Sequence, residues 1–225
     1  MDDAGSFWLA SLSLASDLES DESNPRRSRS PVRRHQTYQG AKTDEVIVAE
    51  VGRVLRSART GGCRITCPAG PAVLAPWGLF LGGREEADDV PALQAAGISA
   101  IVNLAYTECL AADSAWGAHY PTDFEILTCD AKDDDTYPLL ELHAPDVERF
   151  IERVRHEGRR VLVHCFAGVN RSPAVCAAYL LRRERMNLYD VVRLLEQRRG
   201  QILQNKSLIR QLVRFARCNG LIERE

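Results

Sequence analysis

The sequence lacks an uninterrupted apolar run long enough to cross a bilayer, and its opening segment does not resemble an export signal. That segment, MDDAGSFWLASLSLAS, has two acids where a signal peptide carries bases, and serines interrupt its apolar stretch. Net charge is also nearly absent, because 29 Lys and Arg almost cancel 31 Asp and Glu. We therefore expect no membrane or nucleic-acid partner, and a location in the cytosol or the nucleus.

The sequence also lacks a cysteine pattern typical of disulfide frameworks or zinc sites. Its 7 cysteines are odd in number and scattered, in a chain long enough to bury a core without crosslinks. Cys63 and Cys67 are close in sequence, but no second Cys or His pair follows at a zinc-ligand spacing. We predict intracellular thiols, and neither a metal nor an organic cofactor.

Residues 1–43 have few apolar side chains after the opening segment, and they divide into an acidic half and a basic half. Such a segment cannot bury enough surface to offset the entropy of ordering, which predicts a disordered low-complexity tail. Its basic cluster at 26–34 fits a nuclear-import signal, a patch phosphorylated at Ser28 or Ser30, or a solvated tail without an addressed role. Residues 44–225 are predicted to form one folded domain.

Apolar periodicity predicts alternating helices and strands from residue 44 onwards. Asp44 is a candidate cap for the opening helix, whose apolar face is formed by Ile47, Val51, Val54, Leu55 and Ala58. Strands are predicted at 63–67, 72–82, 99–104, 124–129 and 160–164, and helices at 86–97, 146–157, 171–184, 187–200 and 207–219. This alternation predicts an α/β fold with a central sheet covered by helices on both faces.

The segment RRVLVHCFAGVNRSPAV, residues 159–175, joins a buried strand to a helix through a loop of small residues. Curled backbone N–H groups and the positive end of the helix favour a phosphate dianion there. Gly168 can take a positive φ and allows close approach, and the planar fork of Arg171 can grip two phosphate oxygens. This strand-to-helix turn is therefore a candidate phosphate-binding loop.

Cys165 begins this loop, where the field that favours a phosphate also stabilises a thiolate. In-line attack by the thiolate on phosphorus gives a phosphocysteine and splits one difficult displacement into two easier steps. His164 is expected to fix the loop by hydrogen bonding, and the Ser172 hydroxyl to assist departure of the thiolate. A lone cysteine beside a strand is more often a core residue, but core packing does not account for Gly168, Arg171 and Ser172.

The leaving oxygen needs a proton, and an acidic run precedes the helix that leads to the active strand. One of Asp133, Asp134 and Asp135 is the candidate general acid, with an expected contribution of about 10²- to 10⁴-fold to the rate. A merely solvated acidic loop is the competing interpretation.

The stretch HCFAGVNRS, residues 164–172, matches the HCxxGxxRS signature of the cysteine-based protein phosphatases and resembles their dual-specificity branch. The resemblance covers residues 72–218, through GLFLG at 78–82, AYLL at 178–181 and the closing Asn205 and Gln211. It implies a mixed, mostly parallel sheet flanked by helices, and a hydrolase for phosphotyrosine, phosphoserine and phosphothreonine in phosphorylated protein substrates. It also implies phosphate contacts from the loop residues Phe166, Ala167, Gly168, Val169, Asn170 and Arg171.

The family register also implies which aspartate is the acid. With Phe150, Ile151 and the Cys165 loop in that register, the general acid falls on Asp134. If the family register is shifted by one residue in either direction, the general acid falls on Asp133 or Asp135 instead.

The residues within the loop leave three alternatives to a protein phosphatase open. Asn170 stands where this branch commonly has Ser, and in this it resembles the messenger-capping RNA 5′-phosphatases of the superfamily. Those enzymes, however, commonly have His at the position of Ala167. Phosphoinositide phosphatases often have basic residues in this loop, whereas Phe166, Ala167 and Val169 are uncharged. A phosphoprotein-binding module is a further alternative, although such relatives usually lack the nucleophile. The absence of a long insertion predicts a shallow pocket that admits all three phosphorylated side chains.

Overall fold

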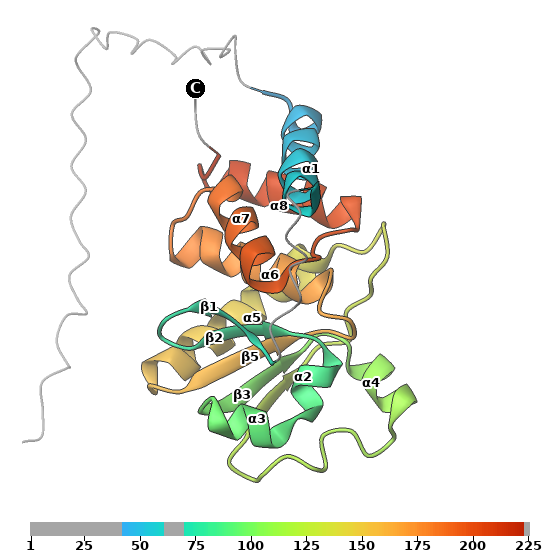
Figure 1. Ribbon diagram of the computed structural model, residues 1–225, viewed down its shortest axis with the longest axis vertical. Helices are drawn as coiled ribbons and strands as arrows, with labels where there is room; N and C mark the ends of the chain where they lie inside the picture. Colours follow the sequence, from blue (N-terminus) through green and yellow to red (C-terminus); the bar gives the residue numbers. More distant parts are fainter. Residues whose placement is uncertain (1–41, 61–69, 223–225) are drawn as a thin grey trace, which may run out of the picture. The chain divides into compact units, whose positions relative to one another are not determined.

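A five-stranded sheet runs through the part of the chain that the structure describes (Figure 1). The structure is a computed structural model that describes residues 42–60 and 70–222. The strands are β1 (Ala72–Ala75), β2 (Leu79–Gly82), β3 (Ile98–Asn103), β4 (Glu125–Thr128) and β5 (Arg160–His164), in the order β1-β2-β5-β3-β4. The β1–β2 pair is antiparallel and the other three pairs are parallel. This confirms the predicted mixed, mostly parallel sheet.

Helices cover both faces of the sheet, as predicted (Figure 1). On one face α5 and α6 pack on the strands, and α8 packs against both of them. On the other face α2 contacts β2 and β5, and α3 contacts β3. The bounds are α1 (Asp44–Thr60), α2 (Arg84–Asp88), α3 (Val90–Ala95), α4 (Tyr106–Ala112), α5 (Leu139–His156), α6 (Arg171–Arg183), α7 (Leu188–Arg199) and α8 (Lys206–Cys218).

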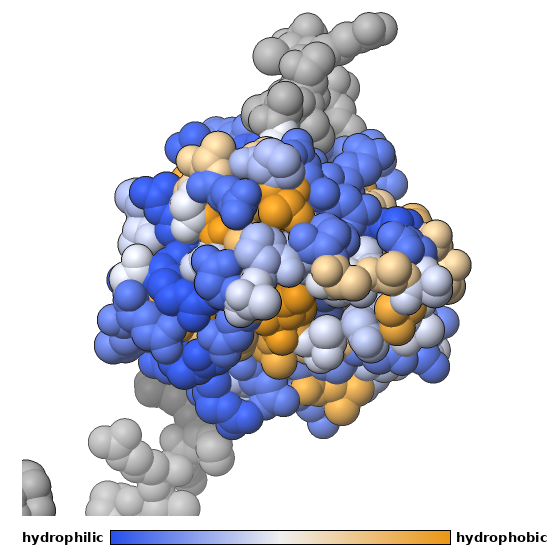
Figure 2. Space-filling model, turned by 90° about the horizontal axis from the view of Figure 1, so that it is seen from below, coloured by the Kyte–Doolittle hydropathy of each residue, from blue (hydrophilic) through white to orange (hydrophobic). Residues whose placement is uncertain are grey.

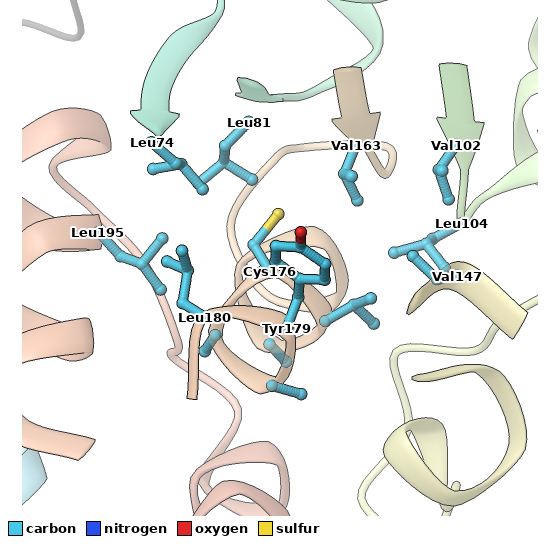
Figure 3. Packing of buried hydrophobic residues seen from close by; sticks show 14 of the residues in the cluster. Leu74, Leu81, Val102, Leu104, Val147, Val163, Cys176, Tyr179, Leu180 and Leu195 are labelled. Atoms are coloured by element: carbon cyan, nitrogen blue, oxygen red, sulfur yellow. The ribbon is translucent and has the colours of Figure 1, made fainter. Parts of the chain in front are cut away.

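The core between the sheet and α6 positions the candidate phosphate loop. All residues of α6 from Arg171 to Leu181 are buried. Figure 3 shows the Cys176 side chain pointing toward the strands, between Leu81 of β2 and Val163 of β5. Burial raises the pKa of the Cys176 thiol, so this cysteine acts as a core residue. The helix that follows the loop is thus anchored along its length.

The opening helix, α1, packs on other helices and not on the sheet. Its apolar face, with Ile47, Val51 and Leu55 buried, lies against α7 and α8. The predicted cap is corrected by one residue, because the N–H of Val46 donates to the Thr43 hydroxyl at 3.4 Å. Asp44 is the first residue of the helix, where its charge suits the helix dipole.

Several predicted elements differ from the observed ones. The single strand predicted at 72–82 is a hairpin, because Gly78 takes a φ of +118° between β1 and β2. The helix predicted at 86–97 is two helices, because Asp89 caps the second by accepting the N–H of Ala92 at 3.0 Å. α5 begins at Leu139 rather than at 146, since it tolerates Pro145 within its first two turns. α4 was not predicted.

Some predictions fall on residues outside the described ranges. These are the tail up to residue 41, the strand at 63–67 and the absence of a metal at Cys63 and Cys67. They stay predictions.

Apolar side chains are dispersed over the surface that is described. On the face seen in Figure 2, hydrophilic residues separate small apolar patches. Within residues 42–60 and 70–222, no helix is both long and apolar enough to span a bilayer. The large exposed apolar side chains are Val46, Val73, Leu142 and Phe166, and Phe166 belongs to the candidate phosphate loop.

Candidate active site

The candidate phosphate loop, residues 165–170, emerges from the middle of the sheet. It follows β5, which lies between β2 and β3, and His164 at the end of β5 pairs with Gly82 and Asn103. The carboxyl ends of three parallel strands therefore meet at one edge, where α6 begins at Arg171. This is the edge at which parallel sheets place their ligands.

Close backbone packing holds the loop in a curled form. Gly168 has a φ of +69°, and a Cβ there would lie 2.8 Å from the Gly82 carbonyl carbon. A Cβ on Gly83 would lie 2.9 Å from the carbonyl carbon of Ala167. The N–H of Arg84 donates to the Phe166 oxygen at 2.9 Å. The turn after β2 thus supports the loop from behind.

A nearly buried ion pair, which sequence analysis missed, reinforces that support. Arg199 at the end of α7 donates to both carboxylate oxygens of Glu86, which also accepts the N–H of Gly83 at 2.7 Å. Burial works to raise the pKa of Glu86, but the hydrogen bonds from Arg199 and Gly83 outweigh it and hold that pKa below its usual range. Glu86 is therefore ionised beneath the loop.

Cys165 lies in a small cavity with a hydroxyl group beside its sulfur. The residue is 2% exposed, and the Ser172 hydroxyl oxygen lies 3.2 Å from its Sγ. The cavity has a volume of about 400 Å³. Its lining includes the loop residues Phe166, Ala167, Val169, Asn170 and Arg171, whereas Gly168 packs on the turn behind. Phe166 is 43% exposed at this site.

His164 is fully buried next to the nucleophile candidate. Its Nδ1 lies 3.3 Å from the Cys165 carbonyl oxygen, and its ring centroid lies 5.7 Å from that of Trp116. Burial lowers the pKa of His164 to about 4, so the imidazole is neutral at neutral pH. That His164 fixes the loop stays a prediction.

Arg171 is held by two other loops. The residue is 4% exposed, and its Nη1 donates to the carbonyl oxygens of Ala131 at 2.8 Å and Leu104 at 3.4 Å. Its Nη2 pairs with a carboxylate oxygen of Glu108 at 2.6 Å. The buried Nε–H has no acceptor among the described residues. Glu108 was not predicted, because it lies on α4, which sequence periodicity did not reveal.

The three candidate acids differ in their surroundings. Asp133 lines the Cys165 cavity, and its two oxygens accept from the side-chain amides of Asn170 at 2.8 Å and Asn205 at 3.0 Å. Asp134 does not belong to that lining, and its Oδ1 accepts from the N–H of Thr136 at 2.8 Å. The Thr136 hydroxyl and N–H hold the pKa of Asp134 below its usual range. Asp135 is exposed.

A buried cysteine at the head of a curled loop that follows a central parallel strand, with a buried arginine at the start of the next helix, is the arrangement that defines the class of cysteine-based phosphatases. The family model described as "Dual specificity phosphatase, catalytic domain" matches residues 79–218. The chain belongs to this family, as the resemblance predicted.

Curated relatives and solved structures agree with this assignment. Human Dual specificity protein phosphatase 2 is 34% identical over 148 residues, which are 65% of this chain and 43% of the relative. Human Dual specificity protein phosphatase 1 is 31% identical over 170 residues, 71% of this chain and 42% of the relative. This chain thus spans less than half the length of these relatives.

The similar solved structures include two human proteins. DUSP28 has a TM-score of 0.59 and 26% identity, over 67% of this chain and 95% of that chain. The tyrosine phosphatase-like serine/threonine/tyrosine-interacting protein has a TM-score of 0.58 and 27% identity, over 66% of this chain and 97% of that chain.

Proposed function

We propose that this chain hydrolyses phosphotyrosine, phosphoserine and phosphothreonine in phosphorylated proteins, through a phosphocysteine at Cys165. The observation that carries the proposal is that Cys165 and Arg171 line the same small cavity beside the curled loop. Membership of the dual specificity phosphatase family supports the same chemistry.

In the first step the Cys165 thiolate attacks phosphorus, an S–P bond forms and the bond from phosphorus to the substrate oxygen breaks. Loop N–H groups and the Arg171 guanidinium bind the phosphoryl oxygens. The Nε–H of Arg171 suits this role, because it is buried and has no acceptor among the described residues. Asp134, which the family register indicates, gives its proton to the leaving oxygen.

In the second step water attacks the phosphocysteine. The S–P bond breaks, the carboxylate formed in the first step takes a proton from that water, and inorganic phosphate leaves. The sulfur departs as a thiolate, and the Ser172 hydroxyl at 3.2 Å stabilises it by donating a hydrogen bond. The enzyme then returns to its starting protonation state.

The loop chemistry supports protein substrates over phosphoinositides. Phe166, Ala167 and Val169 line the cavity and bring no added positive charge for a polyanionic lipid headgroup. The exposed Phe166 ring offers an apolar contact to residues that flank the phosphorylated side chain. We place this activity in signalling in the cytosol or the nucleus.

The proposal is tested by hydrolysis of an aryl phosphate and of three phosphopeptides, with phosphoinositides and 5′-triphosphate RNA as competing substrates. Cys165→Ser is expected to abolish turnover and retain vanadate binding, because the cavity stays intact. Cys218→Ser, at an exposed cysteine, is the matched control. Turnover equal to wild type in Cys165→Ser would refute the mechanism. Phosphopeptide binding without hydrolysis by the wild type would identify a binding module instead.

A further inference from the structure

The side chain of Asn170 joins three segments that are far apart in the sequence. Its Nδ2 donates to Oδ2 of Asp133 at 2.8 Å. Its Oδ1 accepts the backbone N–H groups of Gln204 at 2.7 Å and Asn205 at 3.1 Å. One amide therefore connects the phosphate loop, the aspartate loop (residues 130–138) and the segment that precedes α8.

Asn205 completes the connection from the other side. Its Nδ2 donates to Oδ1 of Asp133 at 3.0 Å, and its Oδ1 caps α8 by accepting the N–H of Ser207 at 2.8 Å. Because the oxygen of each amide already accepts backbone donors, the NH₂ groups of Asn170 and Asn205 must face Asp133. One donor thus meets each oxygen of Asp133, and an ionised carboxylate, which only accepts, fits this arrangement.

Further hydrogen bonds attach the aspartate loop to the beginning of α8. The Ser207 hydroxyl donates to the Asp135 carbonyl oxygen at 2.5 Å, and Nε2 of Gln211 donates to the Tyr137 carbonyl oxygen at 2.9 Å. The phosphate loop is attached to the same region, because the N–H of Leu203 donates to the Val169 oxygen at 2.7 Å. Both loops are therefore hydrogen-bonded to one shared segment, residues 203–207, which fixes their positions relative to each other.

We propose that Asp133, Asn170 and Asn205 form a clamp that holds the aspartate loop against the phosphate loop before substrate binds. Asp133 is then a positioning residue whose two oxygens are engaged, and the adjacent Asp134 is the proton donor. This inference rests on the proposed function, because a loop that carries the proton donor must be placed over the Cys165 sulfur. Asn170 is central, because its amide accepts on one side and donates on the other.

The first test compares two aryl phosphates, because a good leaving group needs little protonation and a poor one needs much. Asn170→Ala and Asp133→Ala are expected to lower kcat at least about 10-fold for phenyl phosphate and much less for 4-nitrophenyl phosphate. Asp134→Asn is expected to lower kcat for phenyl phosphate about 10²-fold or more. Its pH profile is expected to lack the basic limb, because that limb reports loss of the proton from the general acid. The double variant Asp133→Ala, Asn170→Ala is expected to have a kcat for phenyl phosphate no lower than that of either single variant.

Two results would overturn the clamp. If Asp133→Asn removes the basic limb while Asp134→Asn keeps it, Asp133 is the proton donor and not a positioning residue. If the losses from Asp133→Ala and Asn170→Ala add fully, the two side chains do not act through their shared contact.

The second test does not depend on activity. Amide hydrogen exchange of residues 131–136 is expected to be faster in Asn170→Ala than in the wild type, because the loop loses its tie. The matched control is Asn219→Ala, since Asn219 lies at the other end of α8 and donates to the Phe215 oxygen at 2.7 Å. Faster exchange in Asn170→Ala, together with no turnover by the wild type, would leave the clamp standing and refute the proposed function. Unchanged exchange with normal turnover would refute the clamp alone.

Discussion

The hydroxyl oxygen of Ser172 lies 3.2 Å from the Cys165 sulfur and 3.1 Å from the carbonyl oxygen of Gly82. A hydroxyl has one proton, so it donates to one of these acceptors at a time. Gly82 is fixed by its pairing with His164 across β2 and β5. The hydroxyl is therefore held between a rigid backbone acceptor and the sulfur, and it can turn to the sulfur when charge develops there.

Ser172→Ala is expected to slow the second chemical step more than the first. A hydrogen bond to a charged group contributes about 1.5–3 kcal/mol, so thiolate departure should slow roughly 10- to 100-fold. The phosphocysteine then accumulates, and a burst of product precedes slower turnover. Rapid mixing with an aryl phosphate measures the burst, and acid quenching traps the phosphoenzyme. Ser99→Ala, at the opposite end of β3 from the site, is the control. A slowed reaction without a burst would contradict this role.

Glu108→Gln is expected to tighten the binding of vanadate or phosphate about 2- to 10-fold. Glu108 pairs with Nη2 of Arg171 at 2.6 Å, so its charge lies next to the place proposed for a phosphate dianion. Glutamine keeps a hydrogen-bond acceptor and removes the like-charge repulsion. The gain should shrink as salt is raised, because the Glu108 carboxylate is partly exposed to solvent. Inhibition constants at low and high salt measure it, with Glu141→Gln on α5 as control. Weaker binding in the variant would show that Glu108 mainly orients the arginine.

The contiguous part of the site could be predicted from the sequence, because its chemistry is concentrated in nine consecutive residues, HCFAGVNRS. A strand, a glycine with positive φ and a helix start follow from that local order alone. Glu108 and Asn205 could not be found in this way. Glu108 is 63 positions from its partner Arg171, and Asp133 is 72 positions from Asn205. Contacts of this kind depend on the packing of whole elements, which local periodicity does not report.

The same distinction separates the elements that were predicted from those that were not. β5 and α6 have continuous apolar patterns and were predicted at nearly their observed bounds. The helix predicted from residue 146 begins earlier, at Leu139, and includes Pro145, while Leu139 and Leu140 are buried in the core. Tertiary burial outweighed local propensity there.

His164 is expected to make folding stability depend on pH between about 6.5 and 4. Burial lowers its pKa from the ordinary value to about 4, so the unfolded chain binds the proton first as pH falls. The contribution is therefore complete above about pH 6.5 and is lost as pH falls toward 4, with a maximum of about 3 kcal/mol.

Denaturant unfolding of the wild type and His164→Gln at several pH values measures this effect. The difference in unfolding free energy should be largest near pH 7 and shrink toward pH 4. His156→Gln, at the exposed end of α5, is the control. A difference that stays constant over this range would mean that His164 has the same pKa in the folded and unfolded states.

Comparing Gly168→Ala with Gly158→Ala is expected to separate two effects of an added Cβ. One is backbone strain at a positive φ, and the other is a clash with atoms that pack closely on the phosphate loop. The two glycines have nearly the same φ, +69° and +68°, so a Cβ adds a similar strain of about 1–2 kcal/mol at each. A Cβ on Gly158 meets no atom within 4 Å, whereas one on Gly168 would lie 2.5 Å from the Arg199 guanidinium and 2.8 Å from the Gly83 nitrogen. Backbone at that distance cannot yield without moving the loop. Gly158→Ala should therefore lose only the strain energy and keep vanadate affinity, while Gly168→Ala should lose more stability and most of its vanadate affinity. Equal losses in both quantities would show that the close packing of the loop on the β2 turn does not shape the anion site.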